Sequence, residues 1–257
     1  QDARDYHALA RILEDLDPNI VIHLAAVSHA NKSNKDPYST FDHSLRTLEN
    51  TLDVTKGWIE HFIYFSSSMV YGNFTSGSVN EETKCEPIGI YGNLKFAGEL
   101  IVKSYNQVFG LPYTIIRPSA LYGERCVSRR VGQIFIESAI NNKEITIQGD
   151  GEEKLDFTYI QDLINGVIKA INSNKSLKNT FNLTYGKSHS INTLIDILKE
   201  SFPNIKVKYT KRDKLMPVRG TLSTNKAKRL INYKSKWPLK IGYNEYIKWY
   251  IDFTKKK

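Results

Sequence analysis

The sequence predicts an α/β fold built on a parallel sheet. Three short segments, at residues 20–24, 62–65 and 113–117, are rich in β-branched and aromatic side chains, as buried parallel strands are. Between them lie longer stretches in which apolar residues recur at helical spacing. Strands that alternate with helices of this length form βαβ units with right-handed crossovers. With 257 residues, 40% of them hydrophobic, the chain is long enough to bury a sizeable core.

The helices of the first half have recognisable beginnings and ends. Charged and aliphatic side chains alternate in the first of them, and Asp17-Pro18-Asn19 marks its end. Asp36-Pro37 begins the second, and Gly110 ends the third. These signals predict helices at residues 5–15, 36–52 and 91–108.

After Pro118 the pattern changes to shorter elements. Ser190 stands before an apolar-periodic stretch and is a good helix N-cap. Helices are expected at residues 133–141, 161–171, 191–202 and 243–253, and short strands at 145–147, 181–183 and 207–209. We therefore expect a sheet domain over residues 1–120, to which 156–185 return, and a smaller α+β domain that is mainly 121–257.

The composition argues against several classes of partner. The net charge of +9 comes mostly from lysines scattered along the chain, without a zinc-finger or RNA-binding signature, so no nucleic acid partner is expected. No apolar run approaches the roughly 18 residues of a membrane span, so no membrane partner is expected. Cys85 and Cys126 form no metal-ligand or CxxC pattern, which predicts reduced thiols, a cytoplasmic protein and no metal site.

Ser67, Tyr91 and Lys95 are the predicted catalytic residues. Of the 15 tyrosines, only Tyr91 is followed four residues later by a lysine, and residues at this spacing share one face of a helix. A lysine there favours the phenolate, which predicts a pKa below the usual value of about 10 and proton exchange with a sugar hydroxyl at neutral pH. Ser67 lies just after the strand at 62–65, so we expect its hydroxyl at the carboxyl edge of the sheet, where open α/β sheets bind ligands.

Five motifs in order carry a resemblance to a known family. They are Val21 to Ala26, Ser66 to Gly72, Tyr91 with Lys95, Arg117-Pro118 with Leu121-Tyr122-Gly123, and Gly149-Asp150-Gly151 with Asp156 to Asp162. The chain resembles the extended short-chain dehydrogenase/reductases, in particular the NAD-dependent nucleotide-sugar epimerase/dehydratase family. The resemblance implies a Rossmann-like, doubly wound parallel sheet with a small substrate domain, NAD as cofactor and a nucleotide-diphosphate sugar as substrate.

The resemblance also implies roles for single residues. The residues that match cofactor-binding positions are Asp2 and Ala3 at the adenine, Leu24, Ala25 and Ala26 over the ribose and phosphates, Tyr91 and Lys95 at the nicotinamide ribose, and Pro118 at the nicotinamide end. The residues that match substrate positions are Ser68, Met69, Arg125, Gln133 and Arg219. For Arg219, an ordinary surface cation is the alternative.

One expected element of the family is absent from the sequence. The glycine-rich turn GxxGxxG normally follows the first strand and places a helix N-terminus at the pyrophosphate. Here the first recognisable motif is the one that normally follows the third strand. This predicts that about two βα units, roughly 60 residues, precede the sequence, and that its sheet lacks the first strands. His43, Arg46 and Ala120 also depart from the residues usual in the family.

Met69 distinguishes among the reactions of the family. Dehydratases of the family place an acid at this position, and a thioether can neither donate nor accept that proton. The resemblance therefore favours reversible hydride transfer at one carbon, as in a 4-epimerase. The alternatives are a net dehydrogenase or reductase, a dehydratase on the same scaffold, and a non-catalytic relative that binds NAD or a nucleotide sugar. The family also implies a homodimer through two helices, here at residues 37–56 and 91–108.

Overall fold

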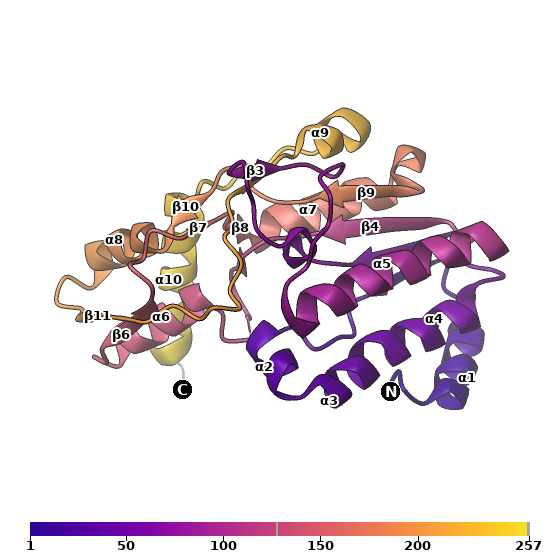
Figure 1. The fold of residues 1–257 in the computed structure, drawn as a ribbon, viewed down its shortest axis with the longest axis horizontal. Helices are drawn as coiled ribbons and strands as arrows, with labels where there is room; N and C mark the ends of the chain where they lie inside the picture. The colour runs from indigo at the N-terminus through magenta and orange to yellow at the C-terminus, as the bar shows by residue number, and fades with distance from the viewer. Residues whose placement is uncertain (127, 256–257) are drawn as a thin grey trace.

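A four-stranded parallel sheet lies at the centre of the larger part of the molecule (Figure 1). The computed structural model describes residues 1–126 and 128–255. The strands lie in the order β1 (Ile20–His23), β2 (His61–Phe65), β4 (Tyr113–Arg117) and β9 (Asn179–Asn182). Neighbouring strands are parallel, with Ile63 opposite both Ile22 and Thr114. The predicted parallel α/β sheet is therefore confirmed, and the strand expected at 181–183 does return to it.

Helices cover both faces of this sheet, as a doubly wound fold requires. On one face lie α4 (Thr47–Thr55) and α5 (Gly89–Phe109), where the buried side chains include Leu48, Leu52, Phe62, Tyr64 and Val102. On the other face lie α7 (Ile160–Ile171) and α9 (Asn225–Ile231), with Ile63, Ile116, Leu163, Phe181 and Ile231. Helix α1 (Tyr6–Leu16) packs against α4. Successive residues of β2 thus point to opposite faces, and both faces are buried.

The helix predicted at residues 36–52 is not regular throughout. Asp36 begins it, because its carboxylate accepts a hydrogen bond from Ser39 N at 3.1 Å. The chain then runs through α3 (Pro37–Phe41), a π-helical turn at Asp42–Arg46, and α4. Thr47 lies at the end of this turn, and its hydroxyl donates to His43 O at 3.0 Å. The apolar pattern carries no sign of one such turn, so the sequence predicted a single regular helix.

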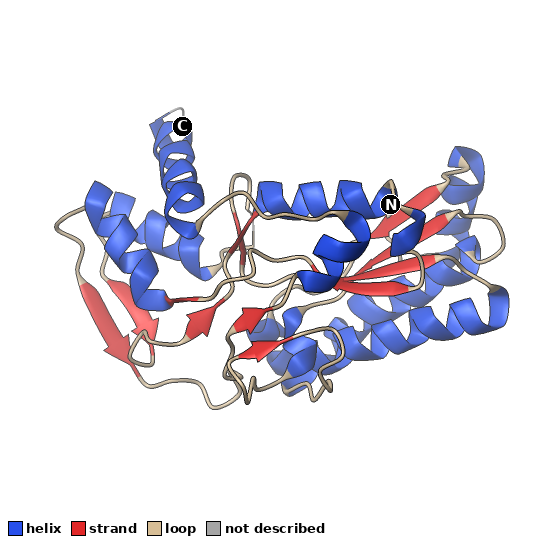
Figure 2. Ribbon diagram, turned by 90° about the horizontal axis from the view of Figure 1, so that it is seen from above, coloured by secondary structure: helices blue, strands red, loops and turns tan. Residues whose placement is uncertain are grey.

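Three helices and a pair of parallel strands form the smaller part of the molecule (Figure 2, left). They are α6 (Val131–Ile140), α8 (Ile191–Ser201), α10 (Leu239–Lys255), β6 (Ile145–Gln148) and β11 (Val207–Thr210). Their shared core includes the fully buried rings of Phe135, Tyr243 and Tyr246. Ser190 caps α8 as predicted, since its hydroxyl accepts a hydrogen bond from Thr193 N. In residues 1–126 and 128–255 no helix is long and apolar enough to cross a membrane.

Pairs of two-residue strands link segments that lie far apart in the sequence. They are β3 (Ser78–Val79) with β12 (Thr221–Leu222), β5 (Leu121–Tyr122) with β8 (Thr158–Tyr159), and β7 (Lys154–Leu155) with β10 (His189–Ser190). Strands this short have no periodicity, and they were not predicted; nor was the short helix α2 (Ala30–Lys35), which has no side-chain N-cap. Beside the β3–β12 pair, Phe74 N donates to Val218 O at 2.8 Å, which fixes the segment that contains Arg219.

Candidate active site

Ser67 lies just beyond the carboxyl end of β2. The backbone is extended at Ser67 and then turns into a 3₁₀ helix at Ser68–Tyr71. The Ser67 hydroxyl caps that helix by accepting a hydrogen bond from Met69 N at 3.2 Å. Ser68 N donates to Pro118 O at 2.9 Å and so ties the end of β2 to the end of β4. The structure therefore places Ser67 and Pro118 at the same carboxyl edge of the sheet.

Helix α5 approaches β2 closely at Gly98. A Cβ atom at this position would lie 2.2 Å from the Tyr64 hydroxyl oxygen. Because no Cβ is present, the Tyr64 hydroxyl reaches the helix backbone and donates to Lys95 O at 3.3 Å. This contact holds the amino-terminal half of α5, with Tyr91 and Lys95, close to the strand that leads to Ser67.

The Lys95 side chain is buried, with 7% of its surface exposed. Its Nζ donates to Phe65 O at 2.6 Å and lies 5.3 Å from the centroid of the Tyr64 ring. Burial lowers the pKa of Lys95 to about 8, and the Glu99 carboxylate opposes this shift. Lys95 therefore loses its proton far more readily than an exposed lysine does.

Tyr91 is half-buried and lies close enough to Ser67 for the serine side chain to lower the pKa of the phenol. Burial raises the pKa of Tyr91, whereas the Ser67 hydrogen bond and the charges of Arg130 and Arg219 oppose the rise. The prediction that Lys95 lowers the pKa of Tyr91 is therefore wrong for this structure. Burial outweighs the nearby charges, and the cations that act on the phenol are arginines.

Arg130 and Arg219 bring positive charge toward Tyr91 from separate segments. Arg130 occupies the N-cap position of α6, and its Nη2 donates to Ser28 O in the loop after β1. Arg219 comes just before β12, and burial together with the charge of Arg130 lowers its pKa to about 10. The charge of the predicted Arg219 thus acts on Tyr91. The charge of Arg130 also acts on Tyr91. Arg130 was not predicted, because it lies far from Tyr91 in the sequence and no motif connects the two residues.

In the described part of the chain, two other predicted substrate residues, Gln133 and Arg125, are not bonded to the predicted catalytic residues. The Gln133 amide is bonded within the smaller part of the molecule: Nε2 donates to Glu137 Oε1 at 2.7 Å and to Tyr250 OH at 3.0 Å, and Oε1 accepts from Arg129 N at 3.0 Å. Arg125 is exposed and has a left-handed backbone, with φ of 61°. Within residues 1–126 and 128–255, no hydrogen bond or ion pair joins either side chain to the predicted catalytic residues.

The predicted adenine-binding pair, Asp2 and Ala3, is held near α4. The Asp2 carboxylate forms an ion pair with Arg4 at 2.6 Å, and hydrogen bonds from Arg4 lower the pKa of Asp2 to about 2. Ala3 O accepts a hydrogen bond from Asn50 Nδ2 at 3.0 Å. Asn50 belongs to α4, so this helix fixes the backbone of the pair.

The loop after β1 presents open backbone near Lys95. Leu24 and Ala25 are exposed, and Ala26 is half-buried. Just before them, His23 Nε2 is buried without a hydrogen-bond partner among the described residues. Burial, and then the charge of Lys95, lowers the pKa of His23 to about 4, so the ring is neutral at pH 7. An open loop, an unpaired imidazole nitrogen and a buried lysine at one sheet edge fit the polar groups of a dinucleotide such as NAD.

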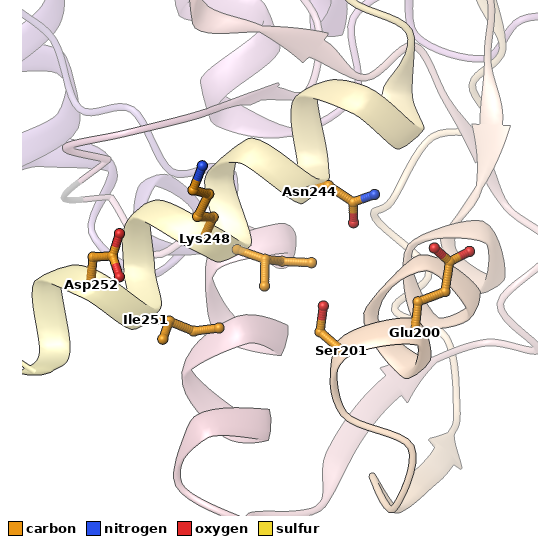
Figure 3. A pocket seen from close by; sticks show the side chains of 7 residues that line it. Glu200, Ser201, Asn244, Lys248, Ile251 and Asp252 are labelled. Atoms are coloured by element: carbon orange, nitrogen blue, oxygen red, sulfur yellow. The ribbon is translucent and has the colours of Figure 1, made fainter.

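A separate surface hollow of about 250 Å³ lies between α8 and α10 (Figure 3). Helix α10 contributes Asn244, Lys248, Ile251 and Asp252, and the end of α8 contributes Glu200 and Ser201. None of the predicted site residues lines this hollow. It is therefore not the site that the sequence predicts.

The chain is also similar in sequence to a known family. Residues 1–184 match the NAD dependent epimerase/dehydratase family. The chain belongs to this family. The recognition made from the sequence motifs is therefore confirmed, together with the Rossmann-like fold class and NAD as the cofactor.

Individual relatives and solved structures similar to this chain carry the names of epimerases. A Bacillus subtilis (strain 168) protein named uncharacterized UDP-glucose epimerase YtcB is 30% identical over 240 residues, which cover 91% of this chain and 74% of the relative. The structure of UDP-glucuronic acid 4-epimerase from Bacillus cereus, in complex with UDP-glucuronic acid and NAD, matches with a TM-score of 0.93 and 27% identity over 98% of this chain and 81% of that one. The structure of Thermotoga maritima UDP-glucose 4-epimerase with UDP-glucose matches with a TM-score of 0.90 and 26% identity. The match covers 99% of this chain and 84% of that one. These similarities support an NAD-dependent nucleotide-sugar 4-epimerase.

Two buried charged residues next to the site were not predicted as functional. Glu99 and Arg117 form an ion pair at 2.6 Å, and their side chains are 0% and 4% exposed. A signal was present, because Glu99 follows Lys95 at helical spacing and so shares its face of α5. A charged residue in a helix is usually solvated, however, and the sequence alone does not show that this one is buried.

Proposed function

We propose that this protein is an NAD-dependent 4-epimerase of a nucleotide-diphosphate sugar. The observation that carries the proposal is the approach of Tyr91 to Ser67 at the carboxyl edge of a parallel sheet, with the buried Lys95 one helical turn after Tyr91 and bonded to Phe65 O. Relatives carry the names putative UDP-glucose 4-epimerase and UDP-glucuronate 4-epimerase, so a UDP-sugar is the proposed substrate class.

In this proposal Tyr91 exchanges a proton with the hydroxyl of the sugar carbon that is oxidised and then reduced. The phenolate takes this proton, and the phenol returns it. The Ser67 hydroxyl holds the phenol oxygen in place, and the Lys95 ammonium binds the cofactor ribose. NAD, when bound, supplies the hydride chemistry at that carbon.

Met69 favours epimerisation over dehydration. It lies in the 3₁₀ turn at the carboxyl end of β2, and its thioether can neither donate nor accept a proton. Dehydratases do occur among the relatives, because a Dictyostelium discoideum dTDP-D-glucose 4,6-dehydratase is 31% identical over 172 residues. The proposed substrate contacts are Ser68, Met69 and Arg219, with Arg130 added. Gln133 is left out because its amide is bonded within the smaller part of the molecule, and Arg125 because its side chain is exposed.

Domain roles, assembly and location belong to the same proposal. Residues 1–120 with 156–185 form the cofactor domain, and the rest of 121–257 forms the substrate domain. The protein is a homodimer, because the segments at 37–56 and 91–108 carry exposed apolar side chains. It is cytoplasmic, a proposal that the two free cysteines support.

The activity is tested by incubating the protein with NAD and single UDP-, GDP- or dTDP-sugars and separating the products by chromatography. An epimerase converts the sugar into its C4 epimer without net formation of NADH. A dehydrogenase accumulates NADH, and a dehydratase eliminates water from the sugar. If none of these sugars is converted, the proposed function is wrong for these substrates.

Tyr91→Phe tests the assignment of the proton-transfer group. We expect kcat to fall by about 100-fold or more, because the ring remains but the acid is gone. The melting temperature should change little. Tyr105→Phe, on the same helix, is the matched control and should keep normal turnover. Near-normal turnover of Tyr91→Phe would contradict the assignment.

A further inference from the structure

Glu99 is a fully buried carboxylate one helical turn after Lys95 on α5. Its Oε1 accepts hydrogen bonds from Ser66 Oγ at 2.5 Å and from Arg117 Nε at 2.8 Å. Its Oε2 accepts a hydrogen bond from Arg117 Nη2 at 2.6 Å. Ser66 follows β2, and Arg117 is the last residue of β4. A single side chain on α5 therefore joins the carboxyl ends of two neighbouring strands.

Each partner of Glu99 precedes a residue of the site in the sequence. Ser66 comes before Ser67, and Arg117 comes before Pro118. Glu99 itself shares one face of α5 with the proposed catalytic tyrosine and lysine, which lie eight and four residues before it. A shift of this helix face relative to the strand ends would change the distance between the catalytic groups.

Further contacts hold the ion pair from other segments. The Arg117 guanidinium lies 4.8 Å from the centroid of the Tyr71 ring. The Tyr71 hydroxyl donates to Asn182 Oδ1 at 2.8 Å, and Asn182 N donates to Glu81 Oε1 at 2.8 Å. These contacts include the 3₁₀ turn after β2 and the end of β9. The orientation of the ion pair is thus fixed by several elements of the sheet edge.

We propose that Glu99 is a positioning residue, which keeps the face of α5 that carries Tyr91 and Lys95 in register with Ser67. This role presupposes the proposed epimerase function. A buried ion pair is a poor source of stability, because the desolvation of both charges offsets their attraction. A two-pronged guanidinium–carboxylate contact does, however, fix both distance and orientation between the elements that carry it.

Glu99 also acts on the charge of Lys95. Its carboxylate opposes the lowering of the Lys95 pKa by burial. The other titratable groups near Lys95 are His23, whose pKa burial lowers, and Tyr64, whose pKa burial raises, so both are uncharged at neutral pH. Removal of the Glu99 charge therefore lowers the pKa of Lys95 further.

Two variants test the proposal. Glu99→Gln keeps the shape of the side chain and removes its charge. The double variant E99L/R117L removes both charges, so it leaves no buried charge unpaired if the single variant fails to fold. We expect kcat to fall on the order of 10²-fold in either variant, with a smaller change in KM. The alkaline limb of the kcat profile of Glu99→Gln should move to lower pH. Crystal structures of both should show Tyr91 displaced from Ser67.

His61→Phe is the matched control, since His61 Nε2 hydrogen-bonds Thr114 Oγ1 at 2.8 Å and so joins the same two strands at their amino ends. It should lower the melting temperature and leave kcat, the pH profile and the Ser67–Tyr91 contact unchanged. Normal kcat with an intact contact in E99L/R117L, or equal effects of the Glu99 and His61 variants, would overturn the proposal. If the unmodified protein is not an epimerase, the proposed function fails, and the crystal structures alone decide whether Glu99 positions the pair.

Discussion

At Tyr91 and Lys95, burial changes acidity in opposite directions. It raises the pKa of Tyr91 and lowers that of Lys95 to about 8. In both residues the uncharged form is favoured, as expected where the dielectric constant is low. A phenolate at Tyr91 therefore depends on other positive charges, and Arg130 and Arg219 are the two that act on it.

We expect Arg219→Met to move the acid limb of the kcat profile to higher pH, by about one pH unit. Loss of the cation raises the pKa of Tyr91, so the phenolate forms only at higher pH. Lys95→Met is the comparison and should move this limb less, because Lys95 is not among the charges that act on Tyr91. The profiles are measured at saturating substrate. A limb that moves only in Lys95→Met would contradict this electrostatic account.

NAD affinity should fall as the pH rises through about 8. Lys95 is proposed to bind the cofactor as an ammonium ion, and burial lowers its pKa from the usual value. The charged form therefore dominates below pH 8 and is lost above it. Fluorescence titrations with NAD from about pH 7 to about pH 9 would measure this affinity. The Lys95→Met variant should bind NAD weakly, and its affinity should not depend on pH. An affinity of the unmodified protein that does not change over this range would contradict the assignment.

The positions of Ser67, Tyr91 and Lys95 could be predicted because each depends on its own strand or helix. A strand end sets Ser67 at the sheet edge, and helical spacing puts Tyr91 and Lys95 on one face. The approach of Arg130 to Tyr91 depends instead on how separate parts of the chain pack together. The direction of the Tyr91 pKa shift was mispredicted for the same reason, since the degree of burial is a tertiary property.

At the scale of elements, the packing of α5 on β2 depends on the absence of a side chain at Gly98. Gly98→Ala should lower the free energy of unfolding by about 1–3 kcal/mol, because the new Cβ would lie 2.2 Å from the Tyr64 hydroxyl and 3.1 Å from Leu48 Cδ2. Displacement of α5 should also lower kcat, since this helix carries Tyr91. Chemical denaturation and steady-state kinetics measure the two effects.

Two further variants distinguish this packing effect from a general effect of alanine. At Gly57 no heavy atom among the described neighbours lies within 4 Å of the position that a Cβ would occupy, so Gly57→Ala should be nearly neutral. Addition of Tyr64→Phe to Gly98→Ala should restore part of the lost stability, because the clashing hydroxyl is removed. If it restores none, α5 is displaced by some other contact.

The longer elements were predicted to within a few residues, whereas the short connections were not. Helices α7 and α8 have strong apolar periodicity, and each was placed at nearly its observed bounds. The two-residue strands and the π-helical turn leave no such pattern, because each is fixed by contacts with a distant segment or by one extra residue in a turn. The position of Arg219 depends on one of these strand pairs.

For the whole molecule, two buried aspartates hold segments from different parts of the chain. Asp156 accepts hydrogen bonds from Gly186 N and Leu222 N, both at 3.1 Å, and Asp162 accepts one from Lys236 N at 2.7 Å. The sequence placed both aspartates in a family motif without a role for either. The structure shows that they bind the backbone of segments more than 25 residues away, which a sequence pattern does not reveal.

Helices α4 and α5 lie side by side on one face of the sheet (Figure 1). Helix α5 carries two exposed apolar side chains, Leu100 (51% exposed) and Val108 (71%), and α3, which precedes α4, carries Tyr38 (87%). Exposed apolar residues on neighbouring helices are typical of a subunit interface. This supports the proposed dimer through the segments at 37–56 and 91–108, with an isologous interface in which the same surface of each protomer meets its partner.

Leu100→Glu should convert the dimer into a monomer, because it places a charge from each protomer within an apolar, self-complementary interface. Ile168→Glu is the matched control: this residue of α7 is 50% exposed, but it lies on the opposite face of the sheet, so the variant should remain a dimer. Size-exclusion chromatography with light scattering measures the mass of each. A monomeric unmodified protein would contradict the dimer, and dissociation by Ile168→Glu alone would place the interface on α7 rather than on α4 and α5.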